Sequence, residues 1–233
     1  MVLIKGIAKT SLIDFQPYVS STLFLGGCNF RCRFCHNPNL VTESHLLKDI
    51  SENDIFGFFK EKKKWIDGVC ISGGEPTIHN DLPIFLKKLK ELGLLVKLDT
   101  NGSNPIMLRQ IIPSGLADKI AMDIKAPRER YEEVCGIKVD MEKIQDSIDV
   151  IMKSGIDYEF RTTVVPGLVG KEDIIKIGEW LKGAKKFCIQ QFRSRGPLLD
   201  KKLEGKETFN KDDIEDMKKT AEKYFDKVEV RYS

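Results

Sequence analysis

The 233-residue sequence lacks several features that mark specialised classes of protein. No apolar run approaches the roughly 20 residues that a membrane-spanning helix needs, so we expect no membrane partner. A signal peptide is also missing, because the first residues, MVLIKGIAKTSLIDF, have neither an apolar core nor a small-residue cleavage site. A cytoplasmic location is therefore expected. Neither sign of charge is in excess, with 38 Lys and Arg against 35 Asp and Glu, so we expect no nucleic-acid partner either.

Internal repeats and low-complexity segments are also absent from the sequence, but one order of local patterns occurs several times along it. A short apolar run is followed by a polar or glycine-rich turn and then by a helical pattern. The apolar runs have the length and the Gly, Asp or Pro boundaries of buried strands. They cover residues 21–27, 67–74, 94–102, 118–125, 158–167 and 186–192, and KVEVRY at 227–232 adds a terminal strand. The helical patterns cover residues 52–64, 82–93, 140–155, 172–183 and 212–225.

Strands that alternate with helices predict parallel βαβ units in one α/β domain covering residues 1–233. We place the core of this domain at about 18–192, followed by a C-terminal loop, helix and strand at 193–233. Six strand–helix units predict a partial (β/α)6 barrel of the TIM type, and a doubly wound open sheet is the alternative that the alternation leaves open. The polar segment 192–211 is interpreted as a solvated loop, with a lid or partner-docking role as the other interpretation.

Polar and ionisable residues gather directly after the predicted strands. The carboxyl ends of parallel strands meet at one mouth of a barrel or one edge of a sheet, so these residues are expected to share a site. They lie in GGCNFRCRFCHNP (26–38), SGGEPT (72–77), DTNG (99–102), MDIK (122–125), VVPG (164–167) and QQF (190–192), with Arg161 inside the fifth strand. The sequence therefore predicts one functional site at this mouth.

Three cysteines, Cys28, Cys32 and Cys35, fall within one short loop in the spacing C-x3-C-x2-C. In a cytoplasmic protein a close cluster of cysteines favours metal binding or catalysis over disulfides. A structural zinc site normally needs four closed ligands, and His36 adjoins Cys35 in the backbone, which makes tetrahedral closure with both awkward. An iron–sulfur cubane fits better, because three thiolates bind three of its irons and leave the fourth open to a non-protein ligand.

The pattern C-x3-C-x-aromatic-C, with Phe34 as the aromatic residue, resembles the signature of the radical S-adenosylmethionine (SAM) enzymes. The resemblance implies a full or partial (β/α) barrel and one [4Fe-4S] cluster bound by the three cysteines. It also implies an oxidoreductase in which SAM chelates the open iron and is cleaved reductively to a 5′-deoxyadenosyl radical. No catalytic residue beyond the cluster and the cofactor is implied.

Two further loops resemble cofactor-binding motifs of the same superfamily. GGEP resembles the GGE motif, with Glu75 as acceptor for the methionine amino group, and DIK places Lys125 on the methionine carboxylate. Asp99 and Asp123 are neighbouring carboxylates at adjacent strand ends, where some relatives hold a monovalent cation. The SAM contacts that the resemblance implies are Phe34, Gly73, Gly74, Glu75, Asp99, Asn101, Lys125, Arg161, Val165 and Gln191.

HNP at 36–38 and the stretch KTSLIDFQPYVSSTLFLGGCNFRC narrow the resemblance to activating enzymes of glycyl radical enzymes. Both are similar to anaerobic ribonucleoside-triphosphate reductase activating proteins and to pyruvate formate-lyase activating enzyme. The resemblance implies a glycyl radical enzyme as protein substrate, foremost anaerobic ribonucleotide reductase, and a reduced flavodoxin or ferredoxin as electron donor. IQQF departs from the Pro- and His-containing stretch of the pyruvate formate-lyase type, so Gln190 or Gln191 is expected to bind the ribose.

Two alternatives remain open from the sequence. A carboxydeazaguanine synthase-like radical SAM enzyme would use the same cluster on a small molecule, and a zinc or redox-sensing module would use the cysteines without catalysis. Cys70, Cys135 and Cys188 are isolated in the sequence and are expected in the core, so no auxiliary cluster is predicted.

Overall fold

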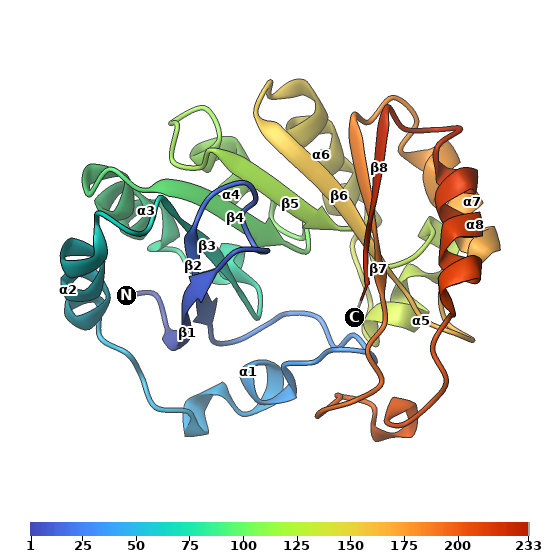
Figure 1. Ribbon diagram of the computed structural model, residues 1–233, viewed down its shortest axis with the longest axis horizontal. Helices are drawn as coiled ribbons and strands as arrows, with labels where there is room; N and C mark the ends of the chain where they lie inside the picture. The colour runs from blue at the N-terminus through green and yellow to red at the C-terminus, as the bar shows by residue number, and fades with distance from the viewer. Residues whose placement is uncertain (233) are drawn as a thin grey trace.

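One eight-stranded β-sheet organises the chain, and its strands lie side by side in sequence order from β1 to β8. The computed structural model describes residues 1–232, and Figure 1 shows the sheet with its surrounding helices. β1 (Ile4–Ser11) pairs antiparallel with β2 (Ser20–Leu25). The strands that follow pair in parallel: β3 Gly68–Gly73, β4 Leu95–Thr100, β5 Lys119–Asp123, β6 Asp157–Val164, β7 Lys186–Gln191 and β8 Lys227–Arg231.

Helical crossovers connect the parallel strands, as parallel pairing requires. The longer helices are α2 Glu52–Lys62, α3 Leu82–Glu91, α4 Pro105–Ile111, α6 Met141–Lys153, α7 Lys171–Trp180 and α8 Lys211–Ala221. The short ones are α1 Pro38–Thr42 and α5 Tyr131–Cys135, with 3-10 turns η1 Ser44–Leu46, η2 Pro76–Ile78, η3 Arg128–Arg130 and η4 Lys201–Leu203. No helix within residues 1–232 combines the length and apolar character needed to cross a membrane.

The local sequence explains where these helices begin and which face they bury. Asp140 caps α6 by accepting hydrogen bonds from the backbone amides of Glu142 and Lys143, as an N-cap carboxylate does. α3 buries Leu82, Phe85, Leu86 and Leu89, which share one helical face. The predicted helix at 82–93 is thus confirmed, whereas α4 and α5 were not predicted because both are short.

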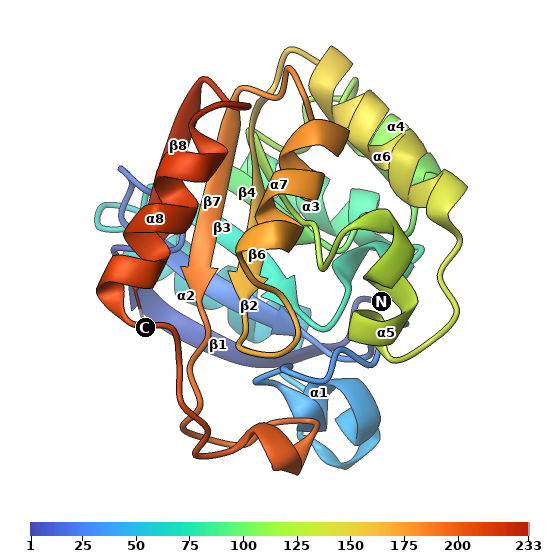
Figure 2. The same ribbon diagram turned by 90° about the vertical axis from the view of Figure 1, so that its right-hand side faces the viewer.

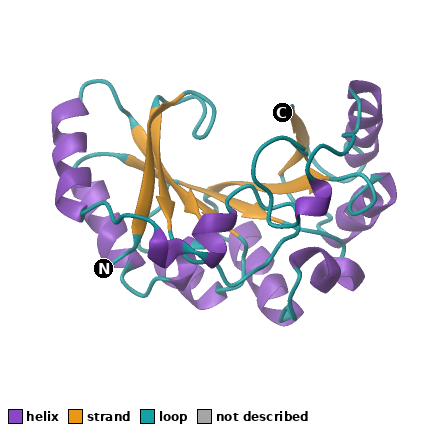
Figure 3. Ribbon diagram, turned by 90° about the horizontal axis from the view of Figure 1, so that it is seen from below, coloured by secondary structure: helices purple, strands orange, loops and turns teal. Residues whose placement is uncertain are grey.

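The sheet bends into an open trough with most helices on its outer side, as Figure 3 shows. The two edge strands, β1 and β8, do not pair with each other within residues 1–232, so the barrel stays open along one side. A doubly wound sheet would carry helices on both faces. The predicted partial barrel is therefore confirmed. β1 is an additional strand that the sequence did not reveal, because IKGIAKTS has no continuous apolar run.

The inner face of the trough is polar, and this feature positions the site. Side chains alternate between the two faces of a strand. In β4, Val96 and Leu98 are fully buried, whereas Lys97 and Asp99 turn inward and form an ion pair at 2.8 Å. In β6, Glu159, Arg161 and Thr163 follow the same spacing of two. The sheet therefore presents charged side chains to the interior of the half-barrel.

The loop after β7 packs against the segment that carries the cysteines (Figures 1 and 2). The amide of Leu199 donates to the carbonyl of Cys35 at 3.0 Å, and that of Asp200 donates to the carbonyl of Arg33 at 2.9 Å. The Arg33 guanidinium also pairs with the Asp200 carboxylate at 2.9 Å. The predicted loop at 192–211 is confirmed apart from the turn η4, but part of it is docked on the protein and is not a purely solvated connection.

Candidate active site

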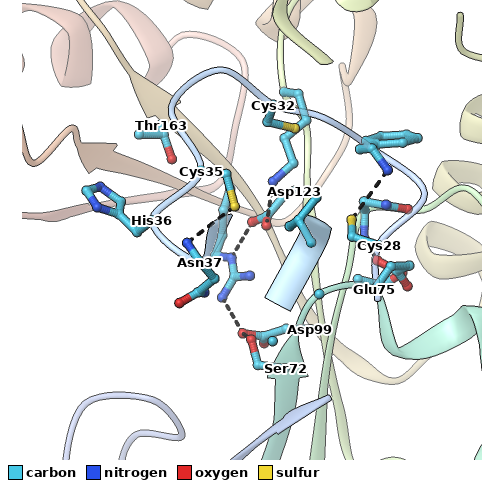
Figure 4. Close-up of a pocket in the computed structure, with 18 of the residues that line it drawn as sticks. Cys28, Cys32, Cys35, His36, Asn37, Ser72, Glu75, Asp99, Asp123 and Thr163 are labelled. Atoms are coloured by element: carbon cyan, nitrogen blue, oxygen red, sulfur yellow. Dashed lines mark hydrogen bonds and ion pairs between the residues drawn. The ribbon is translucent and has the colours of Figure 1, made fainter. Parts of the chain in front are cut away.

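The cysteine loop, residues 26–38, leaves β2 and turns back across the carboxyl ends of the strands. Gly27 makes the turn with φ +85°, a left-handed conformation that favours glycine. The thiols of Cys28, Cys32 and Cys35 all line one cavity of about 350 Å³, within the range of pockets that hold small ligands. Figure 4 shows the three cysteines on one side of this cavity and Asp99 on the other. The cavity therefore joins the cysteines to the ends of distant strands.

The three thiols differ in their electrostatic surroundings. Burial raises the pKa of Cys28 to about 12 and also raises the pKa of Cys35. A hydrogen bond with the Cys135 side chain lowers the pKa of Cys32 to about 7. The backbone carbonyl of Cys135 also accepts a hydrogen bond from the Arg31 amide. Iron ligation replaces the thiol proton, so a bound metal would reverse the preference of Cys28 and Cys35 for the neutral form.

The donor set fits an iron–sulfur cluster better than a single metal ion. Within residues 1–232, no three His, Cys, Asp or Glu side chains converge as ligands of one ion. Three soft thiol donors nevertheless face one cavity from a single loop, and a cubane needs each of them on a different iron. Cys28, Cys32 and Cys35 would hold such a cluster, and the chain then leaves one iron to another ligand.

The glycine pair after β3 meets the cysteine loop backbone to backbone. Gly73 has φ +115°, and a Cβ on Gly74 would lie 1.8 Å from the carbonyl oxygen of Gly27. The amide of Glu75 donates to that same oxygen at 2.8 Å. Only glycine allows this approach, so the two loops that line the cavity are fixed against each other.

Glu75 lies fully buried beneath this contact and joins β3 to β4. Its carboxylate accepts hydrogen bonds from the Asn101 amide at 2.6 Å, from the Thr100 hydroxyl at 2.7 Å, and from the amide and hydroxyl of Thr77 at 3.0 and 2.5 Å. Burial raises the pKa of Glu75, and these four donors oppose that rise. The side chain still lines the cavity, so it both links the loops after β3 and β4 and remains accessible to a ligand.

Two carboxylates at the ends of β4 and β5 share one guanidinium. Arg161 donates to Asp99 at 3.0 Å and to Asp123 at 2.7 Å, while Lys125 pairs with Asp123 at 2.9 Å. Burial alone would raise the pKa of each carboxyl. The positive charge of Arg161 outweighs burial at both, helped by Lys97 at Asp99 and by Lys125 at Asp123, so both pKa values lie below their ordinary range. Burial would lower the pKa of Lys125, and Asp123 outweighs it and raises that pKa. All of these groups are therefore charged at neutral pH.

Most residues predicted for the site line this cavity. They are Cys28, Cys32, Phe34, Cys35, Gly73, Gly74, Glu75, Asp99, Asn101, Asp123, Lys125 and Arg161. Val165 and Gln191 lie outside its lining. Val165 is buried and its amide donates to the Val169 carbonyl at 2.9 Å, while the Gln191 amide group donates to the Phe209 carbonyl at 2.8 Å. Gln190 lines the cavity in place of Gln191, because neighbouring residues of a strand face opposite sides.

Several lining residues were not named individually as site residues from the sequence. Phe30, His36, Asn37, Ser72 and Thr100 lie within the loops that were predicted to share the site, and Gln190 was one of two options. Asp14, Val41 and Thr163 lie outside these loops. Thr163 follows Arg161 by two positions in β6, and this strand spacing is a signal that identifies it. Asp14 precedes β2 in the stretch KTSLIDFQPYVSSTLFLGGCNFRC, for which the sequence predicts no role of this carboxylate, and only the folded chain brings it to the cavity. The predicted core positions of Cys70, Cys135 and Cys188 are confirmed, since all three are buried.

Comparisons with known proteins agree with this geometry. The profile of the Radical SAM superfamily matches residues 22–181. A Methanocaldococcus jannaschii protein that is named as a glycyl-radical enzyme activating enzyme is 34% identical, covering 98% of this chain and 95% of that one. The pyruvate formate-lyase-activating enzyme of Streptococcus mutans is 29% identical over 80% of this chain and 76% of its own.

Among solved structures, Streptococcus suis SuiB bound to S-adenosylmethionine superposes with a TM-score of 0.65 at 15% identity. The match covers 88% of this chain and 48% of SuiB, which is the longer protein. At this level of identity the likeness concerns the fold. It agrees with the open trough that the sheet forms.

Proposed function

The chain belongs to the radical SAM superfamily, among the glycyl-radical-enzyme activating enzymes, and from this premise we propose that it generates a glycyl radical on a partner protein. The observation that carries the proposal is the single cavity in which the cysteine loop meets Glu75 and Lys125. Its chemistry as a radical SAM enzyme requires a [4Fe-4S] cluster and SAM. When both are bound, an electron from the cluster cleaves SAM to methionine and a 5′-deoxyadenosyl radical, which takes a hydrogen atom from a glycine Cα.

The chain's own residues bind and orient SAM in this proposal. Gly73 and Gly74 let the backbone approach the methionine moiety closely. Lys125 has three donor hydrogens and uses one of them on Asp123, so two remain for the methionine carboxylate. Oε2 of Glu75 accepts one hydrogen bond, from the Asn101 amide. The same oxygen is the acceptor for the ammonium group of the methionine moiety. Gln190, which lines the cavity, binds the ribose.

A monovalent cation between Asp99 and Asp123 remains a prediction of the family resemblance. Arg161 bridges the two carboxylates at 3.0 and 2.7 Å and supplies positive charge at this position. We infer that the guanidinium takes over the balancing role of a cation here. Turnover that is the same in sodium, potassium and Tris buffers would support this assignment, and a strict requirement for one ion would contradict it.

The partner in this proposal is an anaerobic ribonucleotide reductase, and the electron donor is a reduced flavodoxin or ferredoxin. Similarity to the group that activates glycyl radical enzymes supports a protein substrate. HNP at 36–38 is a sequence feature typical of activating enzymes of glycyl radical enzymes, and it supports a substrate of this class. A cytoplasmic location belongs to the same proposal, because all six cysteines are free thiols, the form that a reducing compartment maintains.

Anaerobic reconstitution with iron and sulfide, followed by reduction, tests this function. We expect methionine and 5′-deoxyadenosine from SAM, and a glycyl doublet in the electron paramagnetic resonance spectrum when a candidate reductase is added. Cys32→Ala is the control and should lose both. Cleavage of SAM without a glycyl signal on any partner would indicate a small-molecule substrate. Zinc without iron and sulfide would overturn the radical chemistry itself.

A further inference from the structure

The C-terminal end of α5 supports the cysteine loop through backbone hydrogen bonds. The amide of Arg31 donates to the carbonyl of Cys135 at 2.8 Å, and the amide of Arg33 donates to the carbonyl of Val134 at 3.4 Å. Carbonyls in the last turn of a helix have no partner within that helix, and here the cysteine loop supplies the donors. Cys32 lies between the two arginines in the sequence, so the segment that carries this thiol is tied to the helix end on both sides.

Gly136 allows α5 to end directly against the loop. It follows the last residue of the helix with φ +67°, the left-handed conformation that is common where a helix ends. A Cβ at this position would lie 2.5 Å from the carbonyl oxygen of Arg31. Any other residue would therefore push the helix end and the cysteine loop apart.

The thiol of Cys135 is the side chain that this close packing brings to Cys32. Cys135 is fully buried, and a hydrogen bond joins the two side chains. Of the described residues, Cys28, Cys32 and Cys35 line the cavity, whereas Cys135 does not. It therefore stands behind Cys32 on the core side, outside the space that a cluster and its open iron would occupy.

A bound cluster would fix the direction of this hydrogen bond. Sulfur ligated to iron has lost its proton, so Cys32 could only accept. Cys135 keeps its proton and is then the donor, because a thiol is a weak hydrogen-bond donor. The reduced cluster carries one more negative charge than the oxidised one, so a donor at a ligand sulfur stabilises the reduced form and raises the reduction potential.

We propose that Cys135 is a positioning residue of the cluster, whose thiol donates a hydrogen bond to the sulfur of Cys32 and raises the reduction potential of the cluster. This inference rests on the proposed function through its [4Fe-4S] cluster and is independent of the identity of the partner. A higher potential lets a milder electron donor reduce the cluster. Cys135 thus takes part in the electron-transfer step that precedes the cleavage of SAM.

Potentiometric titration of the reconstituted enzyme tests the proposal. Electron paramagnetic resonance follows the reduced cluster, and SAM is omitted so that cleavage does not consume it. In Cys135→Ala the equilibrium constant for reduction should fall about 3- to 10-fold, which is a shift of about 30–60 mV to more negative potential for a one-electron couple. Cys135→Val lacks the donor but fills more of its volume, and should show the same shift. Cys135→Ser retains a donor and should keep most of the original potential.

Cys188→Ala is the matched control, because Cys188 in β7 is equally buried and, among the described residues, is not part of the cavity lining. Its removal should leave the potential unchanged. An unshifted potential in both Cys135→Ala and Cys135→Val overturns the inference, and so does a shift of the same size in Cys135→Ser. If the unaltered protein assembles no iron–sulfur cluster, the proposed function fails as well. A glycyl radical on the partner together with an unshifted potential would overturn this inference alone.

Discussion

Asp99 and Asp123 illustrate how the roles of single residues arise from their neighbours. Either carboxylate alone, buried at a strand end, would favour its protonated form. Arg161 lies between them and binds both, so the three side chains form one charged unit. The motifs DTNG and MDIK mark the carboxylates, whereas the bridging role of Arg161 follows only from the pairing of β5 with β6.

Replacing Arg161 with alanine should strongly destabilise the protein. The change leaves two buried carboxylates without their shared partner, which costs about 3–5 kcal/mol of unfolding free energy when a buried pair is broken. Urea denaturation of the cluster-free protein measures the loss. Arg109→Ala is the matched control, because the Arg109–Asp146 pair at 3.3 Å is exposed and should contribute about 0–1 kcal/mol. Equal losses in the two variants would contradict the buried unit.

Lys125→Ala should weaken the use of SAM without removing the cluster. A hydrogen bond to a charged group contributes about 1.5–3 kcal/mol, so we expect the KM for SAM to rise about 10- to 150-fold. Iron and sulfide content should equal that of the unaltered protein. Lys87→Ala, at an exposed position of α3, is the control and should leave the KM unchanged. A KM within twofold of the control would remove Lys125 from the cofactor site.

At the scale of elements, the site depends on how closely two loops approach each other. The turn after β3 and the cysteine loop meet backbone to backbone, with Gly74 against Gly27. The loop after β7 supports the cysteine loop from the other side through Arg33 and Asp200. Two separate segments thus fix one short loop, which explains how a segment without regular structure can hold its three cysteine side chains in place.

Gly74→Ala tests the contact between these loops. The added Cβ would lie 1.8 Å from the carbonyl oxygen of Gly27, so backbone must move. We expect a destabilisation of about 1–3 kcal/mol or more, together with a lower iron content after reconstitution. Gly57→Ala is the control, since a Cβ at Gly57 in α2 meets no atom within 4 Å and should stabilise the helix by about 1 kcal/mol. Normal iron content in Gly74→Ala would show that the approach is not required.

At the scale of the whole molecule, the half-barrel encloses an unusual amount of charge. Glu159 pairs with Arg231 at 2.8 Å and with Lys186 at 3.4 Å, and this network continues the charged unit of the site toward the other end of the trough. Within this network, carboxylates of the sheet interior are paired with cations. The stability of the fold is therefore tied to the ionisation of its interior carboxylates.

Acidification should destabilise the cluster-free protein in a defined range of pH. The pKa values of Asp99, Asp123 and Glu159 are lowered in the folded state, because cations opposite each carboxylate outweigh the effect of burial. Their contribution is present above the unfolded pKa values of about 3.9–4.3 and is lost as the pH falls through the folded values. The free energy of unfolding, measured with urea at several pH values, should fall steeply below about pH 4. An unchanged free energy between pH 5 and about pH 3 would contradict this account.

The sequence by itself determined the α/β class, and it predicted the three cysteines and most of the residues that line the candidate cavity. Cys28, Cys32, Cys35, the glycine pair and Lys125 belong to short motifs whose spacing carries the chemistry, and each motif follows a strand with a clear apolar pattern. Such signals are local, so no knowledge of distant contacts is needed to read them.

Tertiary structure alone decided the remaining features. It placed Asp14 in the site, chose Gln190 over Gln191, and brought Cys135 to Cys32. It also exposed Arg193 and Arg195 at the open side of the trough. These outcomes depend on the curvature of the sheet and on which face of a strand each side chain occupies. They arise from contacts between residues far apart in the chain, which local patterns do not encode.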